Sequence, residues 1–211
     1  MGLSIEEAFA KRKFREIGDV IKLALAEGGD PYVLIKRCQD AMEEIGRKYQ
    51  SGEYFLAELM LSARMFETAA AILAPLLKKG GASRSIGKIV LGTPKGDVHD
   101  LGKNIFSVMA QAGGFEVVDL GIDVPASRFL EAVRQENPQI VGMSALLTTT
   151  YPSMKEVVKT IEDAGMRQKV KIVIGGGGTG EEARRFVGAD AQTLDAAEGI
   201  RICREFVAGT Q

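Results

Sequence analysis

Apolar positions recur with a helical period through the first 79 residues. Between residues 31 and 50, spacings of three and four separate the members of one apolar set: Val33, Leu34, Cys38, Ala41, Met42, Ile45 and Tyr49. Such spacing is typical of one face of an amphipathic helix. Residues 53–73 carry a second broad apolar face, and Pro75 is expected to kink that helix or to begin a short last one. The pattern predicts a bundle of about four helices.

Short polar signals predict where these helices begin and end. Ser4 and Glu7 have the spacing of a capping box, so the first helix is expected to start there and to continue to Gly28-Gly29. Asp30 followed by Pro31 predicts an N-cap and a first helical residue. The Ser51-Gly52 pair is expected to close the helix that follows.

The rest of the chain alternates short apolar segments with amphipathic ones. Residues 88–92, 115–121, 140–146 and 170–176 are predicted strands, with a weaker fifth at 190–194. Predicted helices separate them, and this alternation favours a parallel sheet with helices on both faces. We therefore expect an α/β chain: a helical cap domain over 1–79, a glycine-rich linker over 80–87, and a flavodoxin-like Rossmann domain over 88–211. The expected strand order of its five-stranded sheet is 2-1-3-4-5.

Composition and charge limit the classes of partner that we expect. The 211 residues have a formal net charge of −1 and no basic stripe, so no nucleic-acid partner is expected. No apolar run approaches the roughly 18 residues of a membrane span, which favours a cytoplasmic protein without a membrane partner. Cys38 and Cys203 stand alone in the sequence and are expected to be buried, reduced thiols rather than ligands of zinc or an iron–sulfur cluster.

The candidate chemistry lies in GDVHDLG, residues 96–102, which contains the only histidine of the chain. Taken alone, this heptapeptide could equally be a solvated polar loop. In a sheet of the expected order, however, ligands bind at the carboxyl ends of the first and third strands. Residues 144–146 lie at the carboxyl end of the third strand and the glycines 175–178 at that of the fourth, so the three segments are expected to meet at one edge.

The chemistry of these segments favours a metal held by a macrocycle. The first strand does not lead into a GxGxxG turn, which disfavours a nicotinamide fold, and Asp97 lacks the upstream acidic pair of a phosphoacceptor receiver. A neutral imidazole whose second ring nitrogen meets a carboxylate is a good axial ligand for a transition metal. One protein ligand suits an ion that a macrocycle already chelates. The glycines would let a ligand approach the backbone, although a mobile turn explains them nearly as well.

Asp97-x-His99-x-x-Gly102, Ser144-x-Leu146 and Gly175-Gly176 resemble the cobalamin-binding signature DxHxxG–SxL–GG. The segment 1–79 is similar to the helical cap of methionine synthase and of the corrinoid proteins in methyltransferase systems. The resemblance covers nearly the whole chain. It implies a corrinoid methyl carrier without substrate selectivity of its own.

The partners implied are a substrate-specific methyltransferase, an acceptor methyltransferase that uses a folate or a thiol, and a reductive activase. The cap is expected to swing aside for these partners, which the glycine-rich linker permits. The cobalamin-binding subunit of an adenosylcobalamin-dependent mutase and a cobalamin-dependent sensor remain alternatives.

The resemblance also implies roles for single residues. His99 would be the lower axial ligand of cobalt, and Asp97 would accept the other N–H of its ring. Thr150 stands where methionine synthase has a serine that extends this hydrogen-bond chain. Phe55, Leu59 and Met60 would shelter the upper face of the corrin, or equally belong to the bundle core. The implied cofactor-binding set is Gly96, Asp97, Val98, His99, Asp100, Leu101, Gly102, Ser144, Leu146, Thr148, Thr150, Gly175, Gly176, Gly177, Phe55 and Leu59.

Overall fold

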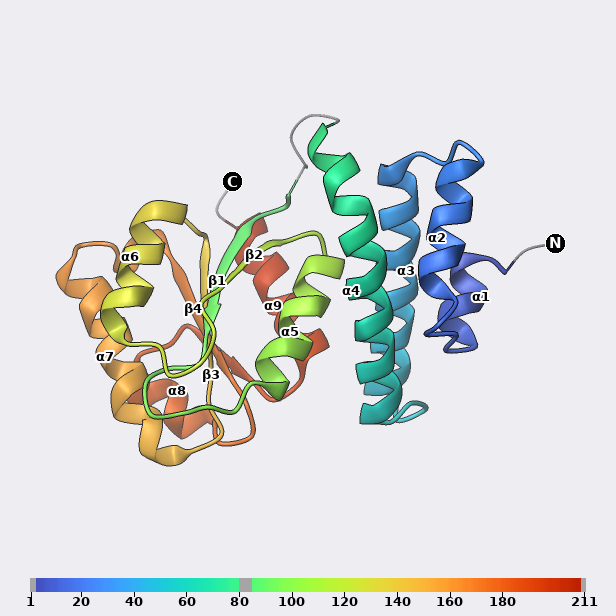
Figure 1. Cartoon of the computed structure of the whole chain (residues 1–211). Helices are drawn as coiled ribbons and strands as arrows, with labels where there is room; N and C mark the ends of the chain where they lie inside the picture. Colours follow the sequence, from blue (N-terminus) through green and yellow to red (C-terminus); the bar gives the residue numbers. More distant parts are fainter. Residues whose placement is uncertain (1–2, 80–84, 210–211) are drawn as a thin grey trace. The chain divides into compact units, whose positions relative to one another are not determined.

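The computed structural model describes residues 3–79 and 85–209. They form two compact units (Figure 1). One contains residues 3–79 together with 112–114, and the other contains 85–111 and 115–209. Most of the predicted linker, residues 80–84, lies outside the described residues.

The first unit is helical, as predicted. Its helices are α1 (Ile5–Ala10), α2 (Ile17–Ala26), α3 (Pro31–Gln50) and α4 (Leu56–Lys79). Helix α3 packs against α1 and α4, and α2 packs against α4. The capping box between Ser4 and Glu7 forms at α1, and Asp30 caps α3 through the Tyr32 backbone N–H.

The prediction of one helix from residue 4 to residue 28 was wrong. A turn separates α1 from α2, and Arg12 in this turn has a left-handed φ of 53°. The Lys13 N–H donates to the Ala8 carbonyl and the Arg12 N–H donates to the Phe9 carbonyl. These two bonds form the Schellman motif that ends many helices, usually with glycine at the left-handed position. Because arginine stands there instead of glycine, no residue at this position indicates the end of the helix.

Helix α4 continues through Pro75 to Lys79, so Pro75 does not begin a separate last helix. Only four residues follow the proline, so few backbone hydrogen bonds depend on that point. Over Leu56–Leu76, α4 is long and apolar enough to cross a membrane, by length and composition alone. A core helix passes the same test. The buried residues of α4 recur at helical spacing and include Leu59, Ala63, Phe66, Ala69 and Leu73.

The second unit is a doubly wound α/β domain. Its parallel strands are β1 (Lys88–Gly92), β2 (Glu116–Asp119), β3 (Ile140–Ser144), β4 (Lys171–Gly175) and β5 (Ala191–Thr193). Their order is β2-β1-β3-β4-β5, which confirms the predicted order. The helices are α5 (Leu101–Ala112), α6 (Ala126–Glu136), α7 (Tyr151–Asp163), α8 (Glu181–Val187) and α9 (Ala196–Ala208), with short 3-10 turns at Thr148–Thr150 and Arg167–Lys169.

Helices α6, α7 and α8 cover one face of this sheet, and α5 and α9 cover the other (Figure 1). Strand β3 is buried along its whole length, which explains its continuous apolar sequence. Phe129 of α6 is fully buried over Gly92, where a Cβ atom would lie 2.8 Å from the phenyl ring. The parallel pairing of β3 with β1 and with β4 brings the carboxyl ends of these three strands to one edge.

Both cysteines are free and buried, as predicted: Cys38 on α3 and Cys203 on α9. Burial raises the pKa of each thiol to about 12. Both thiols are therefore protonated and shielded from solvent at neutral pH.

Candidate cofactor site

The loop after β1 turns sharply before it reaches Asp97. The Asp97 N–H donates to the Pro94 carbonyl at 3.2 Å, and Gly96 between them has φ 91°. A positive φ at the third position of a turn is typical of type II and favours glycine. The turn delivers the Asp97 side chain to the interior, where none of it is exposed to solvent.

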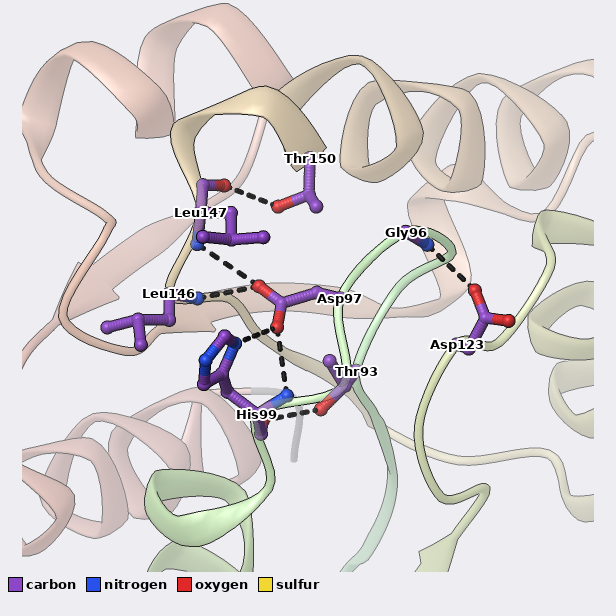
Figure 2. A network of polar contacts seen from close by, with 8 residues as sticks. All are labelled: Thr93, Gly96, Asp97, His99, Asp123, Leu146, Leu147 and Thr150. Atoms are coloured by element: carbon purple, nitrogen blue, oxygen red, sulfur yellow. Dashed lines mark hydrogen bonds and ion pairs between the residues drawn. The ribbon is translucent and has the colours of Figure 1, made fainter.

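The buried Asp97 carboxylate accepts four N–H groups (Figure 2). Its Oδ1 lies 2.9 Å from the backbone N of His99 and 2.8 Å from the ring Nδ1 of the same residue. Its Oδ2 lies 2.8 Å from the N of Leu146 and 3.1 Å from the N of Leu147. Burial alone would raise the pKa of Asp97, but these hydrogen bonds outweigh it and lower the pKa to about 2. The carboxylate is therefore ionised and saturated with donors.

This arrangement sets the chemistry of the His99 ring. Since Nδ1 faces an anionic acceptor, it carries the proton, and the lone pair of Nε2 is left on the opposite side of the ring. The His99 side chain is 48% exposed, so Nε2 is open to a ligand. Apolar side chains exposed near His99 in the sequence or across the Asp97 contacts are Val98, Leu101, Leu146 and Leu147.

The three segments expected at this edge lie together. Ser144, the last residue of β3, pairs with Gly175, the last residue of β4. A Cβ atom on Gly102, in the first turn of α5, would lie 3.9 Å from the Ser144 hydroxyl. Ser144 is largely buried, and within residues 3–79 and 85–209 its hydroxyl has no hydrogen-bond partner. A polar ligand group could complete it.

Two of the glycines after β4 have a role in loop packing. A Cβ atom on Gly176 would lie 2.4 Å from the Ala145 carbonyl oxygen, and one on Gly178 would lie 2.1 Å from that of Leu146. Neither backbone oxygen can give way easily, so the glycines let the loops after β3 and β4 pack backbone against backbone. Gly177 is less constrained, because its nearest neighbour is the flexible end of the Leu146 side chain at 3.0 Å.

Thr150 does not extend the His–Asp chain in the expected way. Its buried hydroxyl donates to the Leu147 carbonyl at 2.6 Å, and both Asp97 oxygens are already occupied by N–H donors. Thr150 thus reaches Asp97 only through the Leu147 peptide (Figure 2). Thr148, at the start of the same 3-10 turn, is exposed.

Several residues of this edge escaped sequence analysis. The Asp123 carboxylate accepts the Gly96 N–H at 2.8 Å, and the Thr93 hydroxyl donates to the His99 carbonyl at 3.3 Å. Lys103, only 3% exposed, pairs with Asp119 at the end of β2. Asp100, which sequence analysis did include in the cofactor-binding set, is exposed and accepts an N–H from the Asn104 amide at 3.1 Å at the start of α5. The sequence signal that could have found some of them is the pair of carboxylates, Asp119 and Asp123, at and just after the end of β2.

The proposed cap residues have different surroundings. Phe55, just before α4, is 74% exposed, and Met60 is 38% exposed. Leu59 is 1% exposed and shares a face of α4 with other buried residues. Leu59 is therefore a core residue, whereas Phe55 has exposed surface that a ligand could contact.

The donor set fits a metal already held in a macrocycle. Across the described part of the chain, no group of three or more histidine, cysteine, aspartate or glutamate residues could hold a bare ion. His99 instead offers a single oriented nitrogen, and the exposed apolar side chains of the neighbouring loop residues suit the face of a large ring. The residues present thus fit a corrin with one protein ligand.

Comparison with known proteins agrees with this fit. Two family models match, each described as a B12 binding domain, one over residues 87–201 and the other over 4–74. The dimethylamine corrinoid protein 3 of Methanosarcina mazei is 39% identical over 167 residues, 79% of this chain and 100% of that protein. The trimethylamine corrinoid protein of Methanosarcina barkeri is 37% identical over 86% of this chain and 85% of its own length.

Two solved structures are also similar. A cobalamin-binding protein from Desulfitobacterium hafniense has a TM-score of 0.73 and 38% identity, with 96% of each chain covered. A chain of the methanol:cobalamin methyltransferase complex MtaBC from M. barkeri has a TM-score of 0.85 and 31% identity, covering 98% of this chain and 79% of that one. The chain therefore belongs to the B12-binding domain family.

Proposed function

We propose that this protein is a corrinoid methyl carrier of a methyltransferase system, with His99 as the lower axial ligand of the corrinoid cobalt. The observation that carries the proposal is the His99–Asp97 pair, with Nδ1 held at 2.8 Å by a buried carboxylate and Nε2 open. The similarity to methylamine corrinoid proteins and to the MtaBC complex supports methyltransferase partners. The resemblance of the motifs to those of corrinoid proteins in methyltransferase systems implies two further partners. These are a reductive activase and an acceptor methyltransferase that uses a folate or a thiol.

When bound, the corrinoid supplies a cobalt centre that can accept and release a methyl group. The role of Asp97 is to keep the proton on Nδ1 and so to direct the Nε2 lone pair outward. Asp97 does not take this proton, because its pKa is lowered to about 2. Its second oxygen contacts only backbone N–H groups, which do not release protons at ordinary pH. The imidazole is thus oriented by Asp97 without a proton path through it.

The remaining residues of this edge are proposed to bind the corrin ring and the nucleotide tail and to shield them from water. Val98, Leu101, Leu146 and Leu147 give an apolar surface for the ring and exclude water from it. Ser144 and Gly175–Gly177 are proposed to line the channel for the nucleotide tail, with the Ser144 hydroxyl as donor or acceptor. Residues 1–79 are proposed as a cap domain that carries Phe55, joined by the linker 80–87 to the cobalamin-binding domain 88–211.

Electron paramagnetic resonance of the full chain, loaded with cobalamin and reduced to cobalt(II), tests the ligand. Since His99 is the only histidine, labelling histidine with ¹⁵N changes each three-line nitrogen splitting into two lines if His99 binds cobalt. An unchanged pattern would mean that the cofactor's own base is the ligand. His99→Ala should abolish the protein-derived splitting.

A second measurement tests carriage against the mutase alternative. After titanium(III) reduction, the cobalamin-loaded protein should be methylated by isotopically labelled methyl iodide. It should then pass the labelled methyl group on in the presence of an acceptor methyltransferase. A protein that instead supports a carbon-skeleton mutase reaction with adenosylcobalamin would overturn the carrier proposal.

A further inference from the structure

The loop after β2 continues to pair with the chain beyond the end of the sheet. The Thr93 N–H donates to Gly121, the Val124 N–H donates to Thr93, and the Lys95 N–H donates to Val124, each at 2.9 Å. These bonds join residues 93–95 to residues 121–124, immediately before the turn that presents Asp97. The position of this turn therefore depends on the loop after β2.

Asp123 holds the turn at two points. Its Oδ1 accepts the Gly96 N–H at 2.8 Å, and its own N–H donates to the Asp97 carbonyl at 3.0 Å. The Gly96 N–H has no role in the bond that closes the turn, which joins Asp97 to Pro94. The turn itself has no acceptor for the Gly96 N–H, and the Asp123 carboxylate supplies one (Figure 2).

The backbone of Asp123 is fitted to this task at a conformational cost. Its φ is 52°, in the left-handed region that residues other than glycine, asparagine and aspartate rarely adopt. The left-handed conformation coincides with both hydrogen bonds to the turn. Asp123 is exposed, so burial of its side chain does not explain the conformation.

We infer that Asp123 is a positioning residue for the axial histidine, an inference whose metal-binding part rests on the proposed function. It does not touch His99. It holds the Gly96 N–H and the Asp97 carbonyl, which lie on either side of the Cα atom that carries the Asp97 side chain. Without this clamp, the Asp97 carboxylate loses its register with the Leu146 and Leu147 N–H groups on one side and with the His99 ring on the other. The orientation of the imidazole would then be less well defined.

Three substitutions separate the contributions of Asp123. Asp123→Gly keeps the left-handed backbone and removes the carboxylate. Asp123→Asn keeps an oxygen acceptor and tolerates the same φ, so it should behave as the native residue. Asp123→Ala loses both features. The matched control is Asn137→Ala, because Asn137 is also left-handed, with φ 47°, at the end of α6 and at the opposite edge of the sheet.

The first measurement needs no cofactor. The ring ¹⁵N signals of the single histidine in the full chain report its tautomer directly. The native protein, Asp123→Asn and Asn137→Ala should keep the Nδ1–H tautomer, whereas Asp123→Gly and Asp123→Ala should shift toward a mixture. A loop with a merely structural role would leave the tautomer unchanged in all of them.

The second measurement uses cobalamin. Asp123→Gly should bind it about tenfold more weakly than the native chain and with reduced ¹⁵N-sensitive splitting. This is the lower end of the range for loss of a ligand's hydrogen-bond partner, because Asp123 acts on His99 only through Asp97. Native tautomer and affinity in Asp123→Gly, or an equal change in Asn137→Ala, would overturn the inference. If the native protein itself shows no histidine-derived splitting, the proposed function fails, and the tautomer measurement still decides the role of Asp123.

Discussion

The Asp97 carboxylate lies 2.8 Å from the backbone N of Leu146, a residue 49 positions away in the chain. This contact joins the loop after β1 to the loop after β3, across the point where the strand order of the sheet reverses. One carboxylate thus connects two loops and orients the His99 ring. The two roles can be separated by experiment.

Asp97→Asn should destabilise the fold. An amide offers one oxygen and one NH₂ group, so two of the N–H donors around residue 97 would face a donor instead of an acceptor. We expect a loss of about 1–3 kcal/mol in the free energy of unfolding, measured by urea titration. Cobalamin affinity should fall about 10–100-fold. The exposed Asp163→Asn, whose carboxylate pairs with Lys159, is the control and should unfold like the native protein.

The contribution of Asp97 should depend on pH in a defined direction. Its pKa in the folded chain is about 2, below the ordinary value of 3.8. A lowered pKa stabilises the fold above the unfolded-state pKa, and this stabilisation is lost as the pH falls through the folded-state value. The shift corresponds to about 2 kcal/mol. The stability difference between the native chain and Asp97→Asn should therefore stay constant above about pH 5 and shrink between about pH 4 and 2. A difference that grows on acidification would contradict the assignment.

Gly178→Ala should disturb the loops after β3 and β4. Its methyl group would meet the Leu146 carbonyl at 2.1 Å, and we expect a destabilisation of about 1–3 kcal/mol, measured by thermal or urea unfolding. Gly180→Ala is the matched control in the same loop, because no atom lies within 4 Å of that Cβ position. Its stability should change by less than about 0.5 kcal/mol, since a weaker N-cap offsets a less flexible unfolded chain. Equal effects at the two positions would mean that the close approach is relieved without strain.

Thr150→Val tests whether Thr150 belongs to the histidine network. Removal of the hydroxyl leaves the Leu147 carbonyl without this donor, which should destabilise the fold by about 1 kcal/mol. The cobalt(II) nitrogen splitting should nevertheless stay close to native, because Asp97 keeps all four donors. Thr150→Ser retains the hydroxyl and should resemble the native chain in both measurements. If the nitrogen splitting in Thr150→Val changes as strongly as in Asp97→Asn, Thr150 does help to orient the His99 ring.

Phe55 and Leu59 should separate binding from stability. Leu59→Ala removes a buried side chain and should lower the free energy of unfolding by about 2–5 kcal/mol. Phe55→Ala should leave stability nearly unchanged but weaken cobalamin binding by the full chain. Leu23→Ala, at an exposed apolar residue of α2, should leave both properties unchanged. Native affinity in Phe55→Ala would remove Phe55 from the proposed cofactor contacts.

The strand order and the edge that carries His99 could be predicted because they depend on periodic signals. Buried parallel strands have continuous apolar sequences, and their carboxyl ends meet at one edge whatever the detailed loop conformation. The Asp97–His99 contact could be expected because the two residues are near neighbours in a short loop. The end of α1 had no such signal, since Arg12 occupies a position where glycine is usual.

The long-range part of the site could not be predicted for a different reason. The bonds from Leu146 and Leu147 to Asp97, and from Gly96 to Asp123, use backbone N–H donors that every residue type except proline possesses. The identity of the donor residue therefore does not reveal which carboxylate it will meet. The same holds for Gly176 and Gly178, whose need for small size comes from the backbone of another loop.

The burial of both thiols has a consequence for the proposed role as a methyl carrier. A thiolate is the form of cysteine that attacks an electrophilic carbon, and a pKa raised to about 12 leaves almost none of it at neutral pH. Cys38 and Cys203 are also inaccessible, so neither competes with the acceptor enzyme for the cargo. If the proposal holds, this burial would protect the carrier from alkylating its own cysteines and leave the methyl group for a partner enzyme.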